Sequence, residues 1–337
     1  MRRKLGRVFA VISNNFSTLL GSLTTMRFSG IPTPAALARR LGITPEQLKE
    51  LVEGVEDLYQ EKKFRKKRGG VGLRVVYIAQ GPILRNVQRR LALCVQDSWT
   101  QPLACVHGFR KGFSALSNAS AHVGREAVAV ADILDFFRNI TADQVLAAFR
   151  FLGANEAIAP LLTRLSTYGG FLPPGTRCSP IISNIVLRDL DTELMAGAAT
   201  YTRYADDLTF SGPRGSVPTE DSLAKTLAGH GFTLRPGSYR VRVAPQRQWV
   251  TGLVVNTGPR LPLAARRRLR QEVHYIVTRG LSAHAAEVQQ DEKKAIFRVL
   301  GSVLNLRSVE PVLGKVLQDK LEAVGHSPSM LFEKDDE

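Results

Sequence analysis

Cysteine and histidine are scarce in this chain of 337 residues, which has three cysteines and six histidines. Cys94, Cys105 and Cys178 form no Cys-x-x-Cys pair, and no two histidines stand at the spacing of metal ligands. The sequence therefore predicts neither a disulfide framework nor a zinc site. This cysteine usage fits a reducing cytoplasm.

Long apolar runs are also missing, since none approaches the ~18 residues that would cross a bilayer. The basic start, Met1 to Lys4, precedes a short apolar stretch that is broken at Ser13. We therefore expect no membrane segment and no export signal.

Acidic residues are outnumbered, because 30 Asp and Glu stand against 46 Lys and Arg, a formal charge of +16 at pH 7. Such an excess predicts a polyanionic partner, and nucleic acid comes first because neutralising its phosphates releases counterions. An anionic membrane surface is the competing explanation. The hydrophobic content of 44% is ordinary for a folded protein, and the length allows two or three packed units.

The order of patterns predicts an α+β protein with one central sheet and a helical C-terminal appendage. We expect strands at 71–79, at 127–137, on both sides of a hairpin at Asp206 and Asp207, and twice within 239–256, with Pro245 in the turn. We expect helices at 82–90, 141–152, 181–194 and 219–229, and from Pro262 onward.

Residues 33–54 predict two short helices. Thr33 opens the first and Gly42 ends it, whereas Thr44 opens the second and Gln47 completes a capping box. Two helices joined this tightly resemble a DNA-binding helix-turn-helix. A plain helical hairpin packed on a larger body is the commoner structure, and we favour it.

A basic run follows at 62–68, where six cations precede Gly69 and Gly70. Most charge runs are solvated surface. This one could also grip phosphates from a mobile hairpin tip.

Two adjacent acids, Asp206 and Asp207, lie inside the apolar, strand-like run 201–210. Burying neighbouring carboxylates is costly, because each raises the cost of ionising the other. A tight hairpin turn is one explanation. The other is a cation that neutralises the pair, and Mg²⁺ bridged by substrate phosphates is the usual solution.

Asp132 ends another apolar strand and is a candidate third ligand. A two-metal polymerase site needs carboxylates from separate strands, with ions ~3.5–4 Å apart. One ion activates the attacking hydroxyl and the other steadies the pyrophosphate leaving group. An isolated acid at a strand end is more often a cap or a turn residue. The surrounding sequence motifs must therefore decide whether Asp132 is a metal ligand.

Seven short motifs occur in a fixed order along the chain. They are Arg74-Val-Val-Tyr77 with Gln80-Gly81-Pro82, His107 to Gly112, Asn118-Ala-Ser-Ala-His122, Asp132 to Phe137, Leu172-Pro-Pro-Gly175 through Asn184, Tyr204-Ala-Asp-Asp207, and Val250-Thr-Gly252. In this order they resemble the reverse transcriptase family, and within it the bacterial retron reverse transcriptases. The resemblance covers roughly residues 33–320.

The resemblance implies a right-hand polymerase architecture, with fingers, a palm that contains an antiparallel sheet, and a helical thumb. It implies an N-terminal helical region at 1–60, fingers at 61–125, a palm at 126–258 with a fingers segment at 141–180, a thumb at 259–325, and a frayed acidic tail at 326–337. It also implies DNA synthesis from dNTPs with two Mg²⁺ ions, for which Mn²⁺ could substitute. Asp132, Asp206 and Asp207 then become catalytic metal ligands, with Ile133 beside them in the metal site.

The nucleotide site is implied at four residues. Phe137 matches the aromatic residue that sits under the sugar and excludes a 2′-OH, and Arg74 matches the fingers cation that holds the triphosphate. Pro174 and Gly175 lie in a loop that reads Leu-Pro-Gln-Gly in the family, so Pro174 stands where the Gln is usual. Because this change removes a polar side chain and a backbone donor and stiffens the loop, we expect an active enzyme with altered nucleotide handling.

The resemblance also implies residues that handle a cognate structured RNA. They are Asn118, His122, Val250, Thr251 and Gly252, together with Arg266, Arg267, Arg268 and Arg270 of a thumb helix along the duplex phosphates. A lone histidine is otherwise more often structural, and an arginine row is otherwise a solvated helix face.

The function implied is RNA-directed DNA synthesis of retron type. The enzyme would copy part of its bound noncoding RNA, start from a 2′-OH of an internal guanosine, and leave single-stranded DNA joined to RNA. An accessory effector protein and a role in anti-phage defence are implied as well. The alternatives are a group II intron-like or other defence-associated reverse transcriptase, and a catalytically silent RNA-binding scaffold marked by Pro174. The three retained acids argue against the scaffold.

Overall fold

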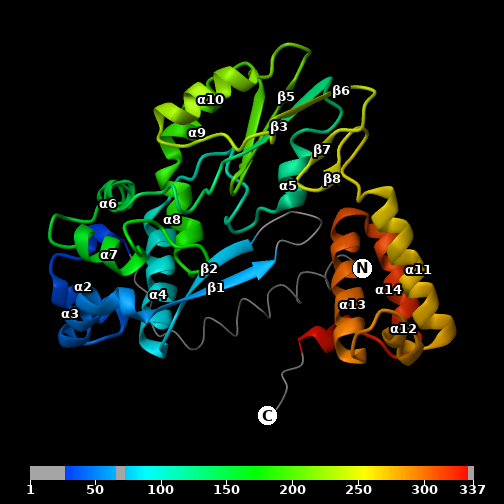
Figure 1. The fold of residues 1–337 in the computed structure, drawn as a ribbon, viewed down its shortest axis with the longest axis horizontal. Helices are drawn as coiled ribbons and strands as arrows, with labels where there is room; N and C mark the ends of the chain where they lie inside the picture. Colours follow the sequence, from blue (N-terminus) through cyan, green and yellow to red (C-terminus); the bar gives the residue numbers. More distant parts are fainter. Residues whose placement is uncertain (1–26, 66–72, 333–337) are drawn as a thin grey trace, which may run out of the picture. The chain divides into compact units, whose positions relative to one another are not determined.

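Residues 27–65 and 73–332 are described by the computed structural model. They form two compact units (Figure 1). The first unit comprises the described parts of Met1–Pro102 and Phe137–Leu187, and the second comprises Leu103–Phe136 and the described part of Arg188–Glu337. The chain therefore passes twice through each unit.

The first unit is a helical body with one two-stranded hairpin. Its elements are η1 (Phe28–Gly30), α2 (Pro34–Leu41), α3 (Pro45–Gly54), η2 (Val55–Leu58), β1 (Tyr59–Arg65), β2 (Leu73–Ala79), α4 (Pro82–Ser98), α6 (Ala142–Phe151), α7 (Ala159–Ser166) and α8 (Ser179–Val186). Helix α4 packs against α2, α7 and α8, and it buries Leu84, Val87 and Leu91 in the core of the unit.

The structure confirms the predicted pair of helices near the N-terminal end of the described residues. Thr33 caps α2, and Gly42 ends it in the left-handed conformation at φ 73°. Thr44 and Gln47 form the predicted capping box at the start of α3. Because α2 packs on α4 and α3 packs on α7, the pair is a helical hairpin on a larger body, as we favoured.

Part of the predicted basic run belongs to a strand. Lys62 and Lys63 are exposed on β1, which pairs antiparallel with β2 in the register Tyr59↔Ala79. The predicted hairpin tip at Gly69 and Gly70 lies outside the described residues.

One predicted helix is wrong in its extent. Residues 181–194 form two helices, α8 and α9 (Arg188–Met195), because Leu187 between them has φ −81° and ψ 3°, which interrupts the helical backbone. The helix predicted at 82–90 is correct in its start but continues to Ser98.

The second unit is built on a four-stranded antiparallel sheet in the order β4-β5-β3-β6. The strands are β3 (Ala127–Asp132), β4 (Thr200–Tyr204), β5 (Asp207–Gly212) and β6 (Arg240–Val243). Strand β3 was expected to reach Phe137, but it ends at Asp132. Turns follow, and Asp135 adopts a positive φ of 40°, which an extended strand does not allow.

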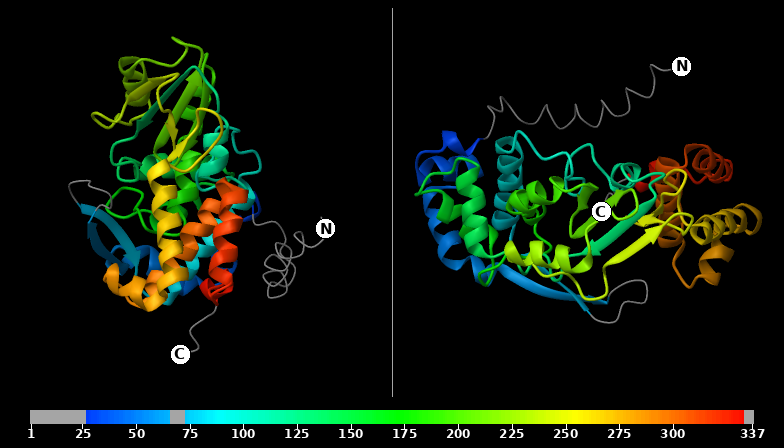
Figure 2. Two further views of the ribbon diagram at one scale, coloured as in Figure 1. Left: turned by 90° about the vertical axis from the view of Figure 1, so that its right-hand side faces the viewer. Right: turned by 90° about the horizontal axis from the view of Figure 1, so that it is seen from above.

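The two faces of this sheet have different neighbours (Figures 1 and 2). Helix α9 packs against β4, and helix α10 (Glu220–Gly229) lies on the same side as α9. The short helix α5 (Ala115–Ser120) lies on the other side. Because side chains alternate along a strand, Asp132, Val130 and Val128 share the face that α5 only partly covers.

The segment 239–256 folds differently from the prediction. It holds three short strands, since β7 (Trp249–Val250) pairs with β8 (Leu253–Val254), whereas β6 pairs with β3. Pro245 therefore does not join a hairpin. It lies in the connection by which the chain leaves the edge of the sheet.

The C-terminal part of the second unit is the predicted helical region. It contains α11 (Leu263–Arg279), α12 (Leu281–Glu287), α13 (Glu292–Val309), α14 (Pro311–Glu322) and η3 (Pro328–Leu331). These helices pack against one another around a core of their own, which includes Val273, Val299 and Leu321 (Figure 2). Across the described ranges, no helix combines the length and apolarity that crossing a membrane requires. The tail expected to fray, 326–337, contains η3, and its last five residues lie outside the described part of the chain.

Candidate active site

Three acidic residues lie at the same end of the four-stranded sheet, on or beside its two inner strands. Asp132 is the last residue of β3 and Asp207 the first of β5, and the two are direct cross-strand partners. Asp206 immediately precedes Asp207, in the turn between β4 and β5, and its carbonyl accepts a hydrogen bond of 3.1 Å from the Ile133 amide. The acidic pair is thus both a hairpin turn and part of a carboxylate cluster.

The pKa of Asp207 reflects the electrostatics of the cluster. Its pKa is raised from 3.8 to about 7, first because surrounding protein limits its hydration and then because Asp206 and Asp132 repel its charge. Arg235 lowers this pKa in part. The Asp207 side chain remains exposed to solvent and lines a hollow, so its pKa is raised without full burial of the carboxylate.

The turn that presents Asp206 depends on a close backbone approach. Ala205 adopts a positive φ of 60°, and the chain segment Cys105–Gly108 runs beside Arg203, where both the His107 and Gly108 amides donate to the Arg203 carbonyl. A Cβ added at Gly108 would lie 2.4 Å from the Ala205 nitrogen. Only glycine fits there without moving the turn.

We expect Gly108→Ala to destabilise the protein by about 1–3 kcal/mol, since overpacking forces the backbone to shift, and, through displacement of Asp206, to reduce the polymerase activity that the sequence motifs imply. Denaturant unfolding and primer extension measure the two effects. Gly229→Ala is the matched control, because a Cβ at Gly229 meets nothing within 4 Å. Wild-type values for both measurements in Gly108→Ala would contradict the role of this contact.

A fully buried ion pair supports the same turn from the other face of the sheet. The Arg203 guanidinium donates to Asp191 of α9 through two hydrogen bonds, Nε to Oδ1 at 2.8 Å and Nη2 to Oδ2 at 2.7 Å. Both side chains are 0% exposed. The remaining Nη1 donates to the Ala205 carbonyl at 3.2 Å, and the Tyr201 hydroxyl also donates to Asp191. Arg203 therefore links helix α9 to the turn.

One arginine lies directly at the carboxylates. Arg235 Nε is 3.0 Å from Asp132 Oδ1, an ion-pair distance whose angle does not make a hydrogen bond. The Arg235 amide donates to the Asp132 carbonyl, and the Ser238 hydroxyl accepts from the Asp132 amide, which fixes the backbone at this point. Arg235 therefore offsets part of the negative charge of the cluster.

The donor set suits a divalent cation, although the side chains do not converge on one point. Within residues 27–65 and 73–332, no group of three His, Cys, Asp or Glu forms a metal cluster. However, Asp132 Oδ1 is buried without a hydrogen bond, and carboxylate oxygens are the ligands that Mg²⁺ prefers. A cation here would relieve the repulsion that raises the pKa of Asp207.

Three of the predicted RNA-binding residues are buried. His122 is 0% exposed, and its ring nitrogens contact Ser211 Oγ and Thr202 Oγ1, both at 2.7 Å. Burial lowers the pKa of His122 to about 4, so the ring is neutral at pH 7. Asn118 and Val250 are buried as well. His122 joins the segment after α5 to strands β4 and β5, and Val250 packs with Ala119 and Val128 in one hydrophobic cluster.

Thr251 and Gly252 form the two-residue turn between β7 and β8, with positive φ values of 45° and 82°. A β-branched residue is strained in this conformation. The Thr251 hydroxyl donates to the Ala115 carbonyl at 2.8 Å, which ties the turn to α5. Both residues line a hollow of about 310 Å³ that also contains Tyr204 and Asp207.

The predicted nucleotide-binding residues belong to the first unit. Arg74 lies in β2, but its side chain is outside the described part of the chain. Phe137 is half-buried in the turns that follow β3. The Tyr77 amide of β2 donates to the Pro174 carbonyl at 2.7 Å, and Gly175 has a φ of 103° where a Cβ would meet Tyr77 at 3.1 Å. The loop therefore lies tightly along β2.

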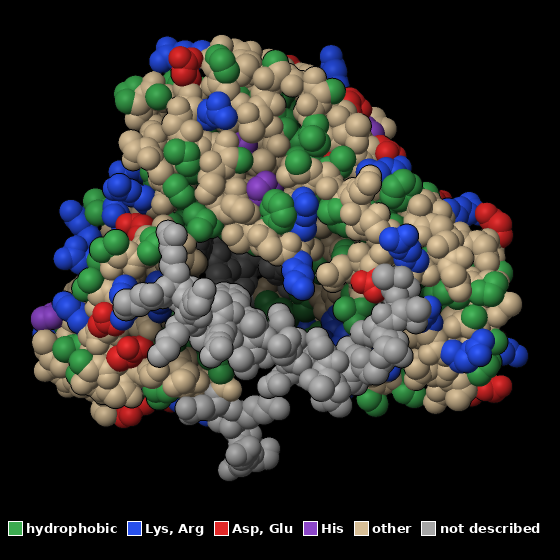
Figure 3. All heavy atoms as spheres, turned by 180° about the vertical axis from the view of Figure 1, so that it is seen from behind, with side chains coloured by type: hydrophobic (Ala, Val, Ile, Leu, Met, Phe, Trp, Pro, Cys, Tyr) green, Lys and Arg blue, Asp and Glu red, His purple; other side chains and the backbone are tan. Residues whose placement is uncertain are grey.

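The predicted row of thumb arginines divides into two pairs. Arg266 forms an ion pair with Glu310 at 3.1 Å, and Arg268 forms one with Glu272 at 3.0 Å. Arg267 and Arg270 are exposed, and no carboxylate partner appears for either among the described residues. Two of the four cations are therefore already engaged within the protein. Lys and Arg side chains are also spread over the face of the molecule in Figure 3.

Comparison with known proteins identifies relatives of this chain. No protein-family model matches the chain. It is 29% identical to the Retron Ec86 reverse transcriptase of Escherichia coli over 252 residues, which cover 69% of this chain and 76% of that protein. It is 34% identical to the Retron Mx162 and Retron Mx65 reverse transcriptases of Myxococcus xanthus. The chain is therefore similar to retron reverse transcriptases over much of its length. It spans 47% and 57% of the lengths of the two Myxococcus relatives.

Several residues that shape this retron-type site were not singled out from the sequence. Asp191 and Arg203 pair between the consecutive elements α9 and β4, whereas Arg235 contacts Asp132 from a segment far along the chain. The sequence contained one usable signal, because Arg203 is a charge within an apolar strand and therefore needs a partner.

Proposed function

We propose that this chain is an RNA-directed DNA polymerase that copies part of a bound structured noncoding RNA into single-stranded DNA joined to that RNA. The observation that carries the proposal is the register Asp132↔Asp207 with Asp206 in the adjoining turn. It brings the three acids of the family motifs to one end of the sheet.

Asp132, Asp206 and Asp207 are the residues that would hold Mg²⁺ ions, which supply activation of the primer hydroxyl and stabilisation of the pyrophosphate. Ile133 contributes through its backbone, since its amide holds Asp206 and its carbonyl accepts from Arg235 at 3.5 Å. The chain itself orients these acids by strand pairing, by the close approach of Gly108, and by the Arg203–Asp191 pair. In this proposal the sheet belongs to the palm, β1 and β2 belong to the fingers, and α11 to α14 form the thumb.

Pro174 gives the nucleotide site a testable property. We expect Pro174→Gln to lower the KM for dNTPs by about 2- to 10-fold, since one regained hydrogen bond contributes on that order, and to change misincorporation. Pro174→Ala is the control, because it removes the stiff ring without adding an amide. Unchanged KM and misincorporation in Pro174→Gln would sink the idea that this position governs nucleotide handling.

The retron reaction makes a specific product. Synthesis begins from a 2′-OH of an internal guanosine in the bound RNA, so DNA and RNA remain covalently joined. The product acts in anti-phage defence together with an effector protein. The supporting observations are the similarity to retron reverse transcriptases and a formal charge of +16, which suits a polyanionic partner.

Sequencing of nucleic acid that copurifies with the protein tests the proposal. We expect one RNA species and one single-stranded DNA whose mobility changes on RNase treatment. RNA that copurifies without any complementary DNA, from cells in which wild-type protein is produced, would support the silent scaffold instead.

A further inference from the structure

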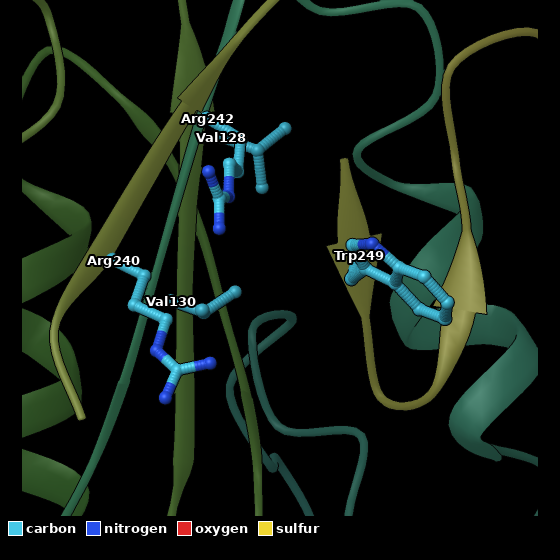
Figure 4. Close-up of a pocket in the computed structure, with 5 residues that line it drawn as sticks. All are labelled: Val128, Val130, Arg240, Arg242 and Trp249. Atoms are coloured by element: carbon cyan, nitrogen blue, oxygen red, sulfur yellow. The ribbon is translucent and has the colours of Figure 1, made fainter. Parts of the chain in front are cut away.

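The open face of the sheet in the second unit carries another hollow beside the carboxylates. Val128 and Val130 of β3 form its floor, Arg240 and Arg242 come from the neighbouring strand β6, and Trp249 of β7 lies across from them (Figure 4). Its volume is about 230 Å³. Val130 and Trp249 also line the hollow that contains Asp207, so the two hollows adjoin.

The register explains why these side chains gather. Arg242 pairs with Val128 and Arg240 with Val130 across the ladder, and residues two apart on a strand point to the same face. His122 and α5 cover this face over β4 and β5, where His122 contacts Thr202 and Ser211. The part over β3 and β6 stays open.

The cations of this hollow are available. Arg240 and Arg242 are exposed, and within the described residues neither has a carboxylate partner. A third cation, Arg247, lies with its guanidinium 5.9 Å from the centre of the Trp249 ring. Trp249 is 37% exposed, although indole rings normally bury most of their surface.

An indole face, an apolar floor and free guanidinium groups together match one chemical class of ligand. A nucleobase is planar and stacks on an aromatic ring, while its phosphate carries the charge that arginine binds. The hollow is smaller than the about 300–1,000 Å³ of drug-sized ligand pockets, which suits one ring. A base inside a duplex is already paired and stacked on both sides, so it cannot enter.

We infer that Trp249, Arg240 and Arg242 bind one unpaired nucleotide of the nucleic acid that the enzyme carries, with the base on Trp249 and its phosphate on the arginines. This rests on the proposed function and adds to it a single-strand subsite next to the active site. RNA is commonly recognised through unpaired bases that stack on aromatic or arginine planes.

Fluorescence of Trp249 tests the inference directly. The chain has two tryptophans, so Trp99→Phe leaves Trp249 as the only indole in the full-length protein. After removal of bound nucleic acid at high salt, we expect a single-stranded 12-nucleotide oligo(U) to quench this fluorescence, and a blunt duplex of the same length to leave it nearly unchanged. Trp249→Ala should weaken oligo(U) binding about tenfold, measured by fluorescence anisotropy of a labelled oligonucleotide. Trp249→Phe should bind oligo(U) with an affinity between those of the wild type and Trp249→Ala.

The arginines are tested by salt dependence. Arg240→Gln and Arg242→Gln should each weaken oligo(U) binding, and at least one of them should reduce the slope of log affinity against log salt by about 0.7. Lys225→Gln, an exposed cation on α10, is the control and should change neither. Asp206→Asn should abolish polymerisation without altering the quenching, which separates this subsite from the catalytic proposal. Equal quenching by single strand and duplex, or tight oligo(U) binding with no quenching at all, would overturn the inference.

Discussion

Asp206→Asn and Asp207→Asn are each expected to reduce primer extension on an RNA template by at least about 10²-fold, the scale on which loss of one electrostatic stabiliser acts in an active site. Asparagine keeps the size of the side chain but removes the negative charge that a metal ligand needs. Single-turnover extension in Mg²⁺ measures the effect. Asp221→Asn, an exposed acid in the first turn of α10, is the matched control and should extend normally.

Asp207→Asn should also change stability in a direction opposite to its effect on activity. The folded protein holds the Asp207 proton up to a pKa of about 7, whereas the ordinary value is 3.8. The folded state therefore binds the proton more tightly than the unfolded state, and stability is lost as pH rises through this window. In EDTA, Asp207→Asn should be more stable than wild type at pH 8, with the difference disappearing below about pH 4.

Two results would count against this account of the cluster. Full primer extension by Asp207→Asn would remove the carboxylate from the catalytic machinery. A stability at pH 8 that is equal to wild type, measured by denaturant unfolding in EDTA, would show that neither limited hydration nor repulsion from the other two acids destabilises the charged Asp207 in the folded protein.

Asp191→Ala is expected to be the most destabilising single substitution considered, with a loss of about 3–5 kcal/mol in the free energy of unfolding. It leaves the Arg203 guanidinium with 0% exposure and without its carboxylate, and it also removes the acceptor of the Tyr201 hydroxyl. Denaturant unfolding of the full chain measures the loss, and Asp189→Ala, an exposed acid of the same helix, is the control.

A double variant separates stability from positioning. Replacing both partners with apolar side chains, Asp191→Leu with Arg203→Met, removes the buried charges together, so most of the stability should return. Polymerase activity should stay low, because the hydrogen bond from Arg203 Nη1 to the Ala205 carbonyl is lost. If the double variant regained both stability and activity, Arg203 would not position the turn.

Local patterns in the sequence were most reliable where one residue type has one structural use. The caps at Thr33, Thr44 and Thr141 marked the starts of three helices correctly, because a hydroxyl at this position satisfies a free backbone amide whatever the rest of the protein does. The order of the seven motifs likewise pointed to the retron reverse transcriptases, to which the chain is similar.

The errors arose where an element depends on its partners. The strand predicted to reach Phe137 ends at Asp132, the point at which pairing with β5 stops, and apolar residues beyond it gave no sign of this. Strand β6 pairs with β3, more than a hundred positions earlier in the chain, so the local pattern around Pro245 could not reveal its neighbour.

The sequence by itself determined the kind of chemistry. Two adjacent acids in an apolar run are costly unless a cation neutralises them, and the motifs around them indicate a polymerase metal site. Only the tertiary structure decided how those acids are held. The ladder sets Asp132 opposite Asp207, and Gly108 gives the turn its space. Arg203 reaches that turn from a buried pair with Asp191, and Arg235, in the segment before β6, lies 3.0 Å from Asp132. Each of these contacts joins two different elements or segments, and no local pattern of residues encodes a distance across the fold.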